Sequence, residues 1–268
     1  MVDLKAYFPP KPTLTEKTLP DQTGSVSLIV SFYQSLYILT QFATKVFIVT
    51  GGASGLGFEL INILYARNGK VYLAGRSEDK ALTAIEAMKS KHPKSTGEII
   101  FLYLDLNDLS TIRKSADEFL AKETRLDVLF NNAGVMVPPQ GSKTAQGYEL
   151  QLGTNNLAPF LFTMLLSPLM ASTATKAPKD SVRVVWVSSS AVTIAPNPAV
   201  DFGNMDYHKE EGIWTKYSRS KAGLVMYAAE LARRTNGQGI ISVVSLESHF
   251  FCASFECLQA PLMVTSTN

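Results

Sequence analysis

Apolar positions in the middle of the chain follow two patterns that alternate. Short, continuous β-branched runs such as 45–50 (KVFIVT) are typical of strands buried on both faces of a parallel sheet. Segments with helical spacing lie between them, the first ending shortly before Gly69. We predict strands over 45–50, 70–74, 98–104, 126–131, 182–188 and 240–244, and helices over 58–67, 81–91, 110–122, 148–169 and 216–234.

This alternation predicts an α/β fold, because helices of this length between strands require right-handed crossovers and a sheet covered on both faces. The chain has 268 residues, of which 46% are hydrophobic, enough for one substantial core. We therefore expect a single domain over 45–243, preceded by an N-terminal arm (1–44) and followed by a divergent tail (244–268).

Composition narrows the class of partner. A net charge of +2 gives no general attraction for nucleic acid, so a small molecule is the expected partner. The only cysteines, Cys252 and Cys257, have only His249 near them, which fits neither a disulfide framework nor a metal site. The first residues lack the pattern of a secretory signal, so we expect a cytoplasmic protein.

An apolar stretch inside the arm, 25–44, raises the question of a membrane span. Its longest apolar portion is shorter than the ~20 residues that a span needs, and Ser27, Gln34 and Gln41 interrupt it. We expect an amphipathic packing helix and no membrane insertion.

A glycine-rich turn follows the first predicted strand and opens the first helix: Thr50-Gly51-Gly52-Ala53-Ser54-Gly55-Leu56-Gly57. Glycines let the chain turn tightly and bring backbone N–H groups and a helix N-terminus against a pyrophosphate. A glycine cluster alone is also found in ordinary strand-to-helix loops, but here both flanking elements are present. The turn predicts a Rossmann-type, doubly wound sheet that binds a dinucleotide through Gly51, Ser54, Gly55, Leu56 and Gly57.

Arg76 stands at the end of the second strand, where an NAD enzyme usually has a carboxylate. A guanidinium there suits the 2′-phosphate of NADP through charge-assisted hydrogen bonds. Ser54 and Lys80 could add to this site, although Lys80 could equally be a solvated helix charge.

Further motifs follow in order along the chain, and together with the glycine turn they resemble the short-chain dehydrogenase/reductase family. They are Asp105-Leu106, Asn131-Asn132-Ala133-Gly134, Gly153-Thr154-Asn155-Asn156-Leu157, Val187-Ser188-Ser189 and the YxxxK pattern Tyr217-Ser218-Arg219-Ser220-Lys221. Within the family, the chain looks most like the retinol-dehydrogenase-like reductases. The resemblance implies an NADP-dependent carbonyl or alcohol oxidoreductase. It also implies that Asp105 contacts the adenine, that Asn131 and Asn132 lie beside the cofactor, and that Asn155 is the catalytic asparagine.

Tyr217 and Lys221 are four residues apart on a predicted helix and share one face. A free phenol has a pKa of about 10, and a nearby ammonium favours the phenolate, which suits Tyr217 as the acid–base group. The substrate oxygen needs a second donor, for which we choose Ser189 over the adjacent Ser188, a choice that depends on strand register. By the resemblance, Asn155 holds a water that links Lys221 to solvent.

Two segments depart from the family pattern. After Val243 the chain lacks the Pro-Gly turn that precedes the family's substrate loop and last strand, so we expect that strand and the substrate lid to be missing. Both departures begin with Val-Ser-Leu, at Val26 and Val244, and a common fungal intron donor sequence translates in frame as Val-Ser. We hypothesise that both segments are retained introns.

Three readings of function stay open at this stage. The leading one is an NADP(H)-dependent oxidoreductase, which the intact Ser189, Tyr217 and Lys221 favour. The second is a non-catalytic nucleotide-binding remnant, which the missing Pro-Gly segment favours. The third is an NDP-sugar epimerase or dehydratase, which the Asn131 to Gly134 motif and the short length disfavour. Family relatives are often dimers or tetramers, so a homo-oligomer is possible.

Overall fold

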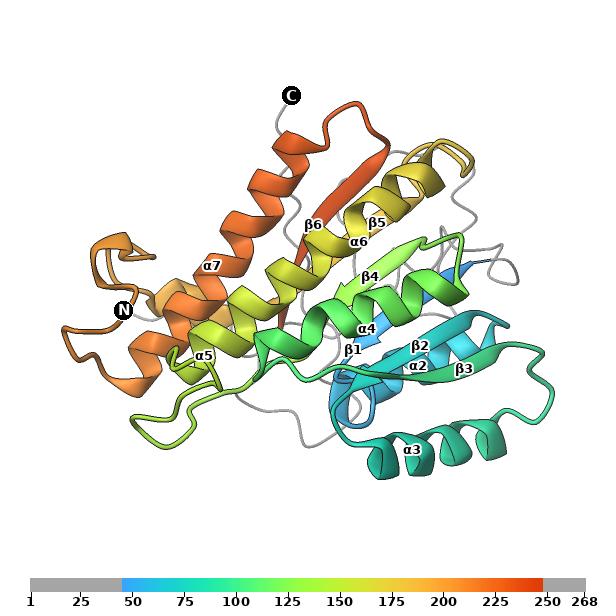
Figure 1. Cartoon of the computed structure of the whole chain (residues 1–268), viewed down its shortest axis with the longest axis horizontal. Coiled ribbons are helices and arrows are strands. Elements are labelled where there is room, and N and C mark those ends of the chain that lie inside the picture. Colours follow the sequence, from blue (N-terminus) through green and yellow to red (C-terminus); the bar gives the residue numbers. More distant parts are fainter. Residues whose placement is uncertain (1–44, 248–268) are drawn as a thin grey trace, which may run out of the picture.

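Parallel strands lie side by side in the order β3-β2-β1-β4-β5-β6 in the computed structural model, which describes residues 45–247 (Figure 1). The chain forms β1 near the centre of the sheet and adds β2 and β3 on one side of it, and then crosses over to add β4, β5 and β6 on the other side. The switch point of the strand order therefore lies between β1 and β4. In such sheets, ligands bind beyond the carboxyl ends of the strands at this switch point. The strands are β1 (Val46–Thr50), β2 (Lys70–Gly75), β3 (Glu98–Tyr103), β4 (Val128–Asn131), β5 (Val182–Ser189) and β6 (Ile240–Glu247).

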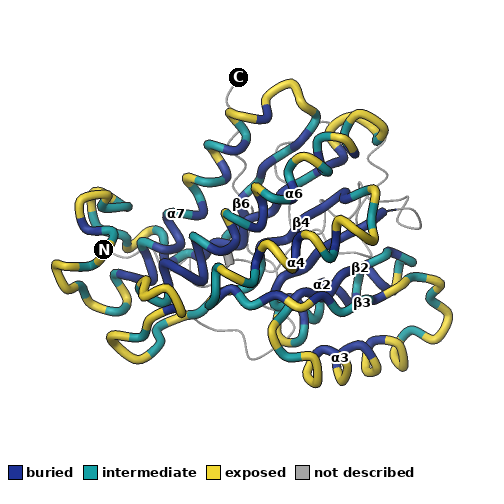
Figure 2. Tube along the Cα trace, in the orientation of Figure 1, coloured by how far each residue is buried: buried dark blue, intermediate teal, exposed yellow. Residues whose placement is uncertain are grey.

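Helices cover both faces of this sheet, and their buried sides turn toward it (Figures 1 and 2). Side chains of α2 and α3 form one apolar cluster with the sheet, and side chains of α4, α6 and α7 form the other. The helices are α2 (Gly55–Ala66), α3 (Glu78–Lys91), α4 (Leu109–Lys122), α5 (Leu150–Leu152), α6 (Ala158–Ala174) and α7 (Ile213–Arg234). The predicted Rossmann-type α/β fold is confirmed.

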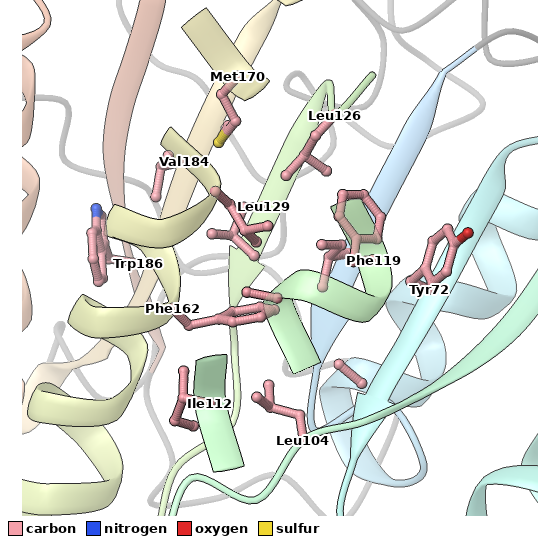
Figure 3. Close-up of a cluster of buried hydrophobic side chains, with 14 of the residues drawn as sticks. Tyr72, Leu104, Ile112, Phe119, Leu126, Leu129, Phe162, Met170, Val184 and Trp186 are labelled. Carbon is pink, nitrogen blue, oxygen red and sulfur yellow. The ribbon is translucent and has the colours of Figure 1, made fainter. Parts of the chain in front are cut away.

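The larger cluster shows why the strands carry continuous apolar runs. Phe119 of α4 and Phe162 of α6 are fully buried against the sheet, and Trp186 of β5 lies beside them (Figure 3). Tyr72 of β2 meets Phe119 edge to face at 4.8 Å between ring centres. Each such side chain contributes about 1.5–3 kcal/mol through burial, so this layer holds the strand ends in fixed positions.

Element boundaries differ from the sequence prediction where local geometry decides them. Helix α2 begins at Gly55, inside the glycine turn, although apolar spacing starts only at Phe58. The predicted helix over 148–169 is divided by a π-helical turn, Gly153–Leu157, and then continues to Ala174. A side chain at Gly153 would collide with Thr144, since an added Cβ would lie 2.2 Å from its Cγ2, so the chain can pack here only with glycine.

Strand β6 also runs further than predicted. It pairs with β5 along its whole length, up to Ser189 with Glu247, so residues 244–247 belong to the sheet and not to the divergent tail. Because Ser245 and Glu247 are polar, this part of the strand lacks the continuous apolar run from which the strands were predicted. The predicted arm (1–44), its apolar stretch, the remaining tail (248–268) and the cysteines in it lie outside the described residues.

One helical segment in the described range, Leu150–Ala174, is long and apolar enough to cross a membrane by length and composition. It runs across the sheet between α4 and α7 (Figure 1), and its apolar side chains, such as Phe162 and Leu166, belong to the core. Core packing therefore accounts for part of its apolar composition, whereas Phe160 and Met164 on the same helix are exposed.

Candidate functional site

A cleft of about 310 Å³ opens at the carboxyl ends of the central strands, at the switch point between β1 and β4. Short segments at the carboxyl ends of four strands line it, so its lining residues come from distant parts of the sequence. They are Thr50, Gly51, Ala53 and Ser54 after β1, Ala74 to Ser77 and Lys80 after β2, Leu104 to Asn107 after β3, and Ala133 to Val135 after β4, with Thr154 from the π-helical turn.

The glycine turn forms one wall of the cleft and is too tight for side chains. Gly51 and Gly55 have positive φ angles of 70° and 56°, which favour glycine. A Cβ at Gly57 would lie 2.5 Å from the carbonyl oxygen of Gly51, so the helix can start this close only without a side chain. Ser54 is the N-cap residue of α2 and is exposed, and its hydroxyl makes no capping hydrogen bond to the helix. The turn and the helix N-terminus are thus shaped to hold an anion.

Cations lie at the outer end of the cleft. Arg76 and Lys80 both line it and are exposed. Asp105 lies opposite on the loop after β3, where its Oδ1 accepts a hydrogen bond from the backbone N–H of Asn107 at 2.9 Å. Both Arg76 and Lys80 therefore add positive charge to the lining of the cleft. Among residues 45–247, no cluster of three or more His, Cys, Asp or Glu side chains could hold a metal ion.

The two asparagines after β4 have different surroundings. Asn132 braces the turn, since its Nδ2 donates to the carbonyl oxygen of Thr50 at 2.8 Å, while the Thr50 hydroxyl accepts from the N–H groups of Asn132 and Ala133 at 3.0 and 2.9 Å. The side chain of Asn131 faces α6, where its Nδ2 donates to the hydroxyl of Thr163 at 2.9 Å, and Asn131 is not among the residues that line the cleft.

Gly134 marks the point where the cleft reaches the predicted catalytic residues. A Cβ there would lie 3.0 Å from Oδ1 of Asn155 and 3.7 Å from Nζ of Lys221. Lys221 donates from Nζ to the carbonyl oxygen of Val187 at 3.0 Å, and its ammonium lies 5.7 Å from the centre of the Tyr217 ring. The structure therefore brings together Lys221, Tyr217 and Asn155 at the inner end of the cleft.

The register of β5 separates the two candidate serines. The hydroxyl of Ser188 donates to the carbonyl oxygen of Lys221 at 2.8 Å, so its proton is used inside the fold. The hydroxyl of Ser189 instead accepts from the N–H of Ala191 at 3.2 Å, where it caps the 3₁₀ turn Ser190–Ile194. An accepting hydroxyl keeps its own proton for donation, which makes Ser189 the better donor of the pair.

Asn155 is held by two residues, Val135 in the loop after β4 and Ser220 of α7. Its Oδ1 accepts from the N–H of Val135, and its Nδ2 donates to the carbonyl oxygen of Val135 and to the hydroxyl of Ser220 at 3.0 Å. Ser220 in turn donates to the carbonyl oxygen of Tyr217 at 2.7 Å. Sequence reasoning missed Ser220 and Thr50, because a hydroxyl that braces a site has no distinctive spacing.

Known proteins are similar to this chain in sequence and in fold. The family model for short chain dehydrogenase matches residues 45–202. A short-chain dehydrogenase/reductase of Emericella nidulans is 54% identical over 87% of this chain and 69% of its own length. One from Phomopsis amygdali is 49% identical over 88% of this chain, which spans only 65% of that protein.

Solved structures agree on the fold. An uncharacterised protein from Mycobacterium paratuberculosis superposes with a TM-score of 0.66 at 29% identity, covering 81% of this chain and 73% of that one. The RhlG protein of Pseudomonas aeruginosa, solved in a complex with NADP, gives a TM-score of 0.61 at 23% identity, covering 79% and 75% of the two chains. The family predicted from the motifs is confirmed: this chain belongs to the short-chain dehydrogenase/reductase family of oxidoreductases.

Proposed function

We propose that the protein is an NADP(H)-dependent oxidoreductase that interconverts a ketone or aldehyde and the corresponding alcohol. The observation that carries this proposal is the position of Lys221 beside Gly134, which lines the cleft, with its ammonium 5.7 Å from the centre of the Tyr217 ring. An acid–base group next to a nucleotide cleft is the arrangement that hydride transfer to a carbonyl requires.

The residues of the cleft fit NADP better than NAD. The bound cofactor supplies the hydride acceptor or donor. The turn from Gly51 to Gly57 would hold its pyrophosphate, and Asp105, which also lines the cleft, would contact its adenine. Arg76 and Lys80 offer two cations to a 2′-phosphate, and a guanidinium binds phosphate by paired, charge-assisted hydrogen bonds.

The catalytic residues divide the remaining work. Tyr217 gives a proton to the carbonyl oxygen during reduction and takes it back during oxidation. Lys221 favours the phenolate form of Tyr217 through its charge and is itself fixed by Val187. Ser189 donates to the substrate oxygen, where negative charge grows in the transition state. Asn155, which lies in the π-helical turn, helps to position Tyr217 through the hydroxyl of Ser220.

The substrate partner in this proposal is a small carbonyl compound or alcohol. The chain spans between 62 and 70% of the length of the curated fungal relatives it matches at 40 to 54% identity. The competing reading, a nucleotide-binding remnant without turnover, keeps the same cleft and differs only in catalysis. A homo-oligomer and a cytoplasmic location stay predictions from the sequence.

The direct test measures NADPH oxidation by absorbance with a panel of aliphatic and aromatic ketones and aldehydes. We expect turnover with part of the panel, and we expect Tyr217→Phe to lower kcat about 10²- to 10⁴-fold, the usual contribution of a general acid. Tyr148→Phe is the control, because Tyr148 is exposed and does not line the cleft. NADPH binding without turnover on any member of the panel would favour the remnant, and full activity of Tyr217→Phe would contradict the assigned chemistry.

A further inference from the structure

A half-exposed aromatic ring lies next to the proposed acid–base group. Trp214, in the first turn of α7, is 44% exposed, and its ring meets the ring of Tyr217 edge to face, with 6.1 Å between the ring centres. Tryptophan side chains are highly buried on average, and a ring left half exposed offers a large apolar surface to a ligand. The proposed hydride transfer uses Tyr217 and gives the neighbouring indole no task.

The first turn of α7 is tied to the loop that follows β4. Gln151 is fully buried; its Oε1 accepts from the N–H of Val137 at 3.0 Å, and its Nε2 donates to the carbonyl oxygen of Ile213 at 3.2 Å. One amide group therefore joins the residue that precedes Trp214 to the loop that contains Gly134. Because Gly134 lies beside the proposed catalytic groups, the backbone at Trp214 has a fixed position relative to them.

The same loop has a strained backbone. Val137 has a φ angle of 50°, in the left-handed region, which costs free energy for a β-branched residue. Such conformations persist where surrounding contacts impose them, and they cluster at active sites. Besides the bond to Gln151, the Nε2 of Gln140 donates to a carboxylate oxygen of Glu210 and to the carbonyl oxygen of Glu211 at 3.1 Å. The loop after β4 and the segment that leads into α7 are thus fastened together at two points.

Charge favours a neutral ligand at this place. The ammonium of Lys216 lies 2.6 Å from a carboxylate oxygen of Glu210, and the guanidinium of Arg219 lies 2.7 Å from one of Glu211. These pairs neutralise the charges that flank Trp214 in the sequence. An ionic substituent would lose its hydration against the indole, whereas a neutral apolar one would not.

We propose that Trp214 determines substrate specificity by packing its exposed indole against an aromatic substituent of the carbonyl substrate, while Tyr217 acts on the carbonyl group. This role rests on the proposed hydride transfer at Tyr217. Aromatic rings attract one another in offset-stacked or edge-to-face pairs, beyond the gain from burial alone. The favoured class is therefore an aryl ketone or aldehyde. Acetophenone is a suitable probe, and acetone, which keeps the methyl ketone and lacks the ring, is its matched control.

NMR of ¹⁵N-labelled tryptophan gives a direct readout, because the chain has two tryptophans. Trp186 is 1% exposed in the core (Figure 3), and its Nε1 donates to the hydroxyl of Ser242 at 3.1 Å, so its indole signal is an internal reference. The full chain is saturated with NADP⁺, which cannot reduce a ketone. We expect acetophenone to shift the Trp214 signal until saturation, and acetone at the same concentration to leave it in place. No shift at Trp214, or equal shifts with both ketones, would overturn the proposal.

Kinetics with two variants of Trp214 test its effect on specificity. Trp214→Ala should lower kcat/KM for acetophenone about five- to tenfold through the loss of one ring–ring contact, with little change for acetone. Trp214→Phe should keep most of the preference, because an aromatic ring remains. Phe160→Ala is the matched control and should keep all of it, since Phe160 is also 44% exposed and stacks on a different tyrosine of α7, Tyr227, at 5.2 Å. Equal losses for both ketones in Trp214→Ala would contradict the assigned role.

The two readouts separate this role from the proposed reaction. Reduction of acetophenone by NADPH without any shift at Trp214 would overturn the contact and leave the hydride transfer in place. A saturable shift at Trp214 without reduction of any ketone or aldehyde in the panel would support the contact and contradict the reaction.

Discussion

The ammonium of Lys221 lies 5.7 Å from the centre of the Tyr217 ring, and both residues are almost fully buried on α7. A buried charge has a strong effect on a neighbouring ionisable group, because little solvent screens it. This pair therefore carries the proposed acid–base chemistry, and the rest of the site holds it in place.

Replacing Lys221 tests the role of its charge. Lys221→Met should lower kcat at least a hundredfold at neutral pH, because the phenolate of Tyr217 loses its stabilising cation. Lys216→Met is a matched control, since Lys216 is also a buried lysine of α7 with its ammonium over a tyrosine ring, 5.0 Å from the centre of Tyr207. Equal losses in both variants would mean that Lys221 acts only through packing.

Ser220 is predicted to position Asn155 and Tyr217. Ser220→Ala should lower kcat several-fold to tenfold with a smaller change in KM, because it removes the hydroxyl that joins Nδ2 of Asn155 to the carbonyl oxygen of Tyr217. Ser218→Ala is the comparison, since its hydroxyl makes a similar bond to Thr215 and does not contact Asn155. Equal kcat values in the two variants, with a difference only in melting temperature, would contradict the positioning role of Ser220.

The hydroxyl of Thr50 is expected to be important for stability. Thr50→Val keeps the shape but leaves the N–H groups of Asn132 and Ala133 without their acceptor, which should cost about 2–4 kcal/mol of unfolding free energy. Urea denaturation measures this cost. Thr83→Val on the exposed face of α3, where the hydroxyl bonds only to Asp79, should cost less than about 1 kcal/mol. Comparable losses would show that the brace between β1 and β4 contributes little.

Much of this arrangement follows from local sequence. Continuous apolar runs identify the strands, and the position of the glycine turn directly after the first of them fixes where the cleft must lie. The alternation of strands and helices is enough to predict a parallel sheet, although the polar end of β6 at Ser245 and Glu247 is recognised as strand only through its pairing with β5.

What the sequence does not show depends on contacts between distant residues. The π-helical turn begins where Gly153 packs closely against Thr144, and the brace at Thr50 joins residues 82 positions apart. The hydroxyl of Ser188 donates a hydrogen bond within the fold, whereas the hydroxyl of Ser189 accepts one. Strand register decides this difference between two adjacent serines.

Thermal unfolding of the purified chain with NADPH and, separately, with NADH tests the proposed NADP(H) site formed by the glycine turn and Arg76. A ligand at a hundred times its Kd stabilises the folded state by about 2.7 kcal/mol, which is roughly 5–10 °C for a domain of this size. We predict this shift with NADPH, a much smaller one with NADH at the same concentration, and loss of the difference in Arg76→Met. Equal shifts with both cofactors, or an unchanged preference in Arg76→Met, would contradict the account.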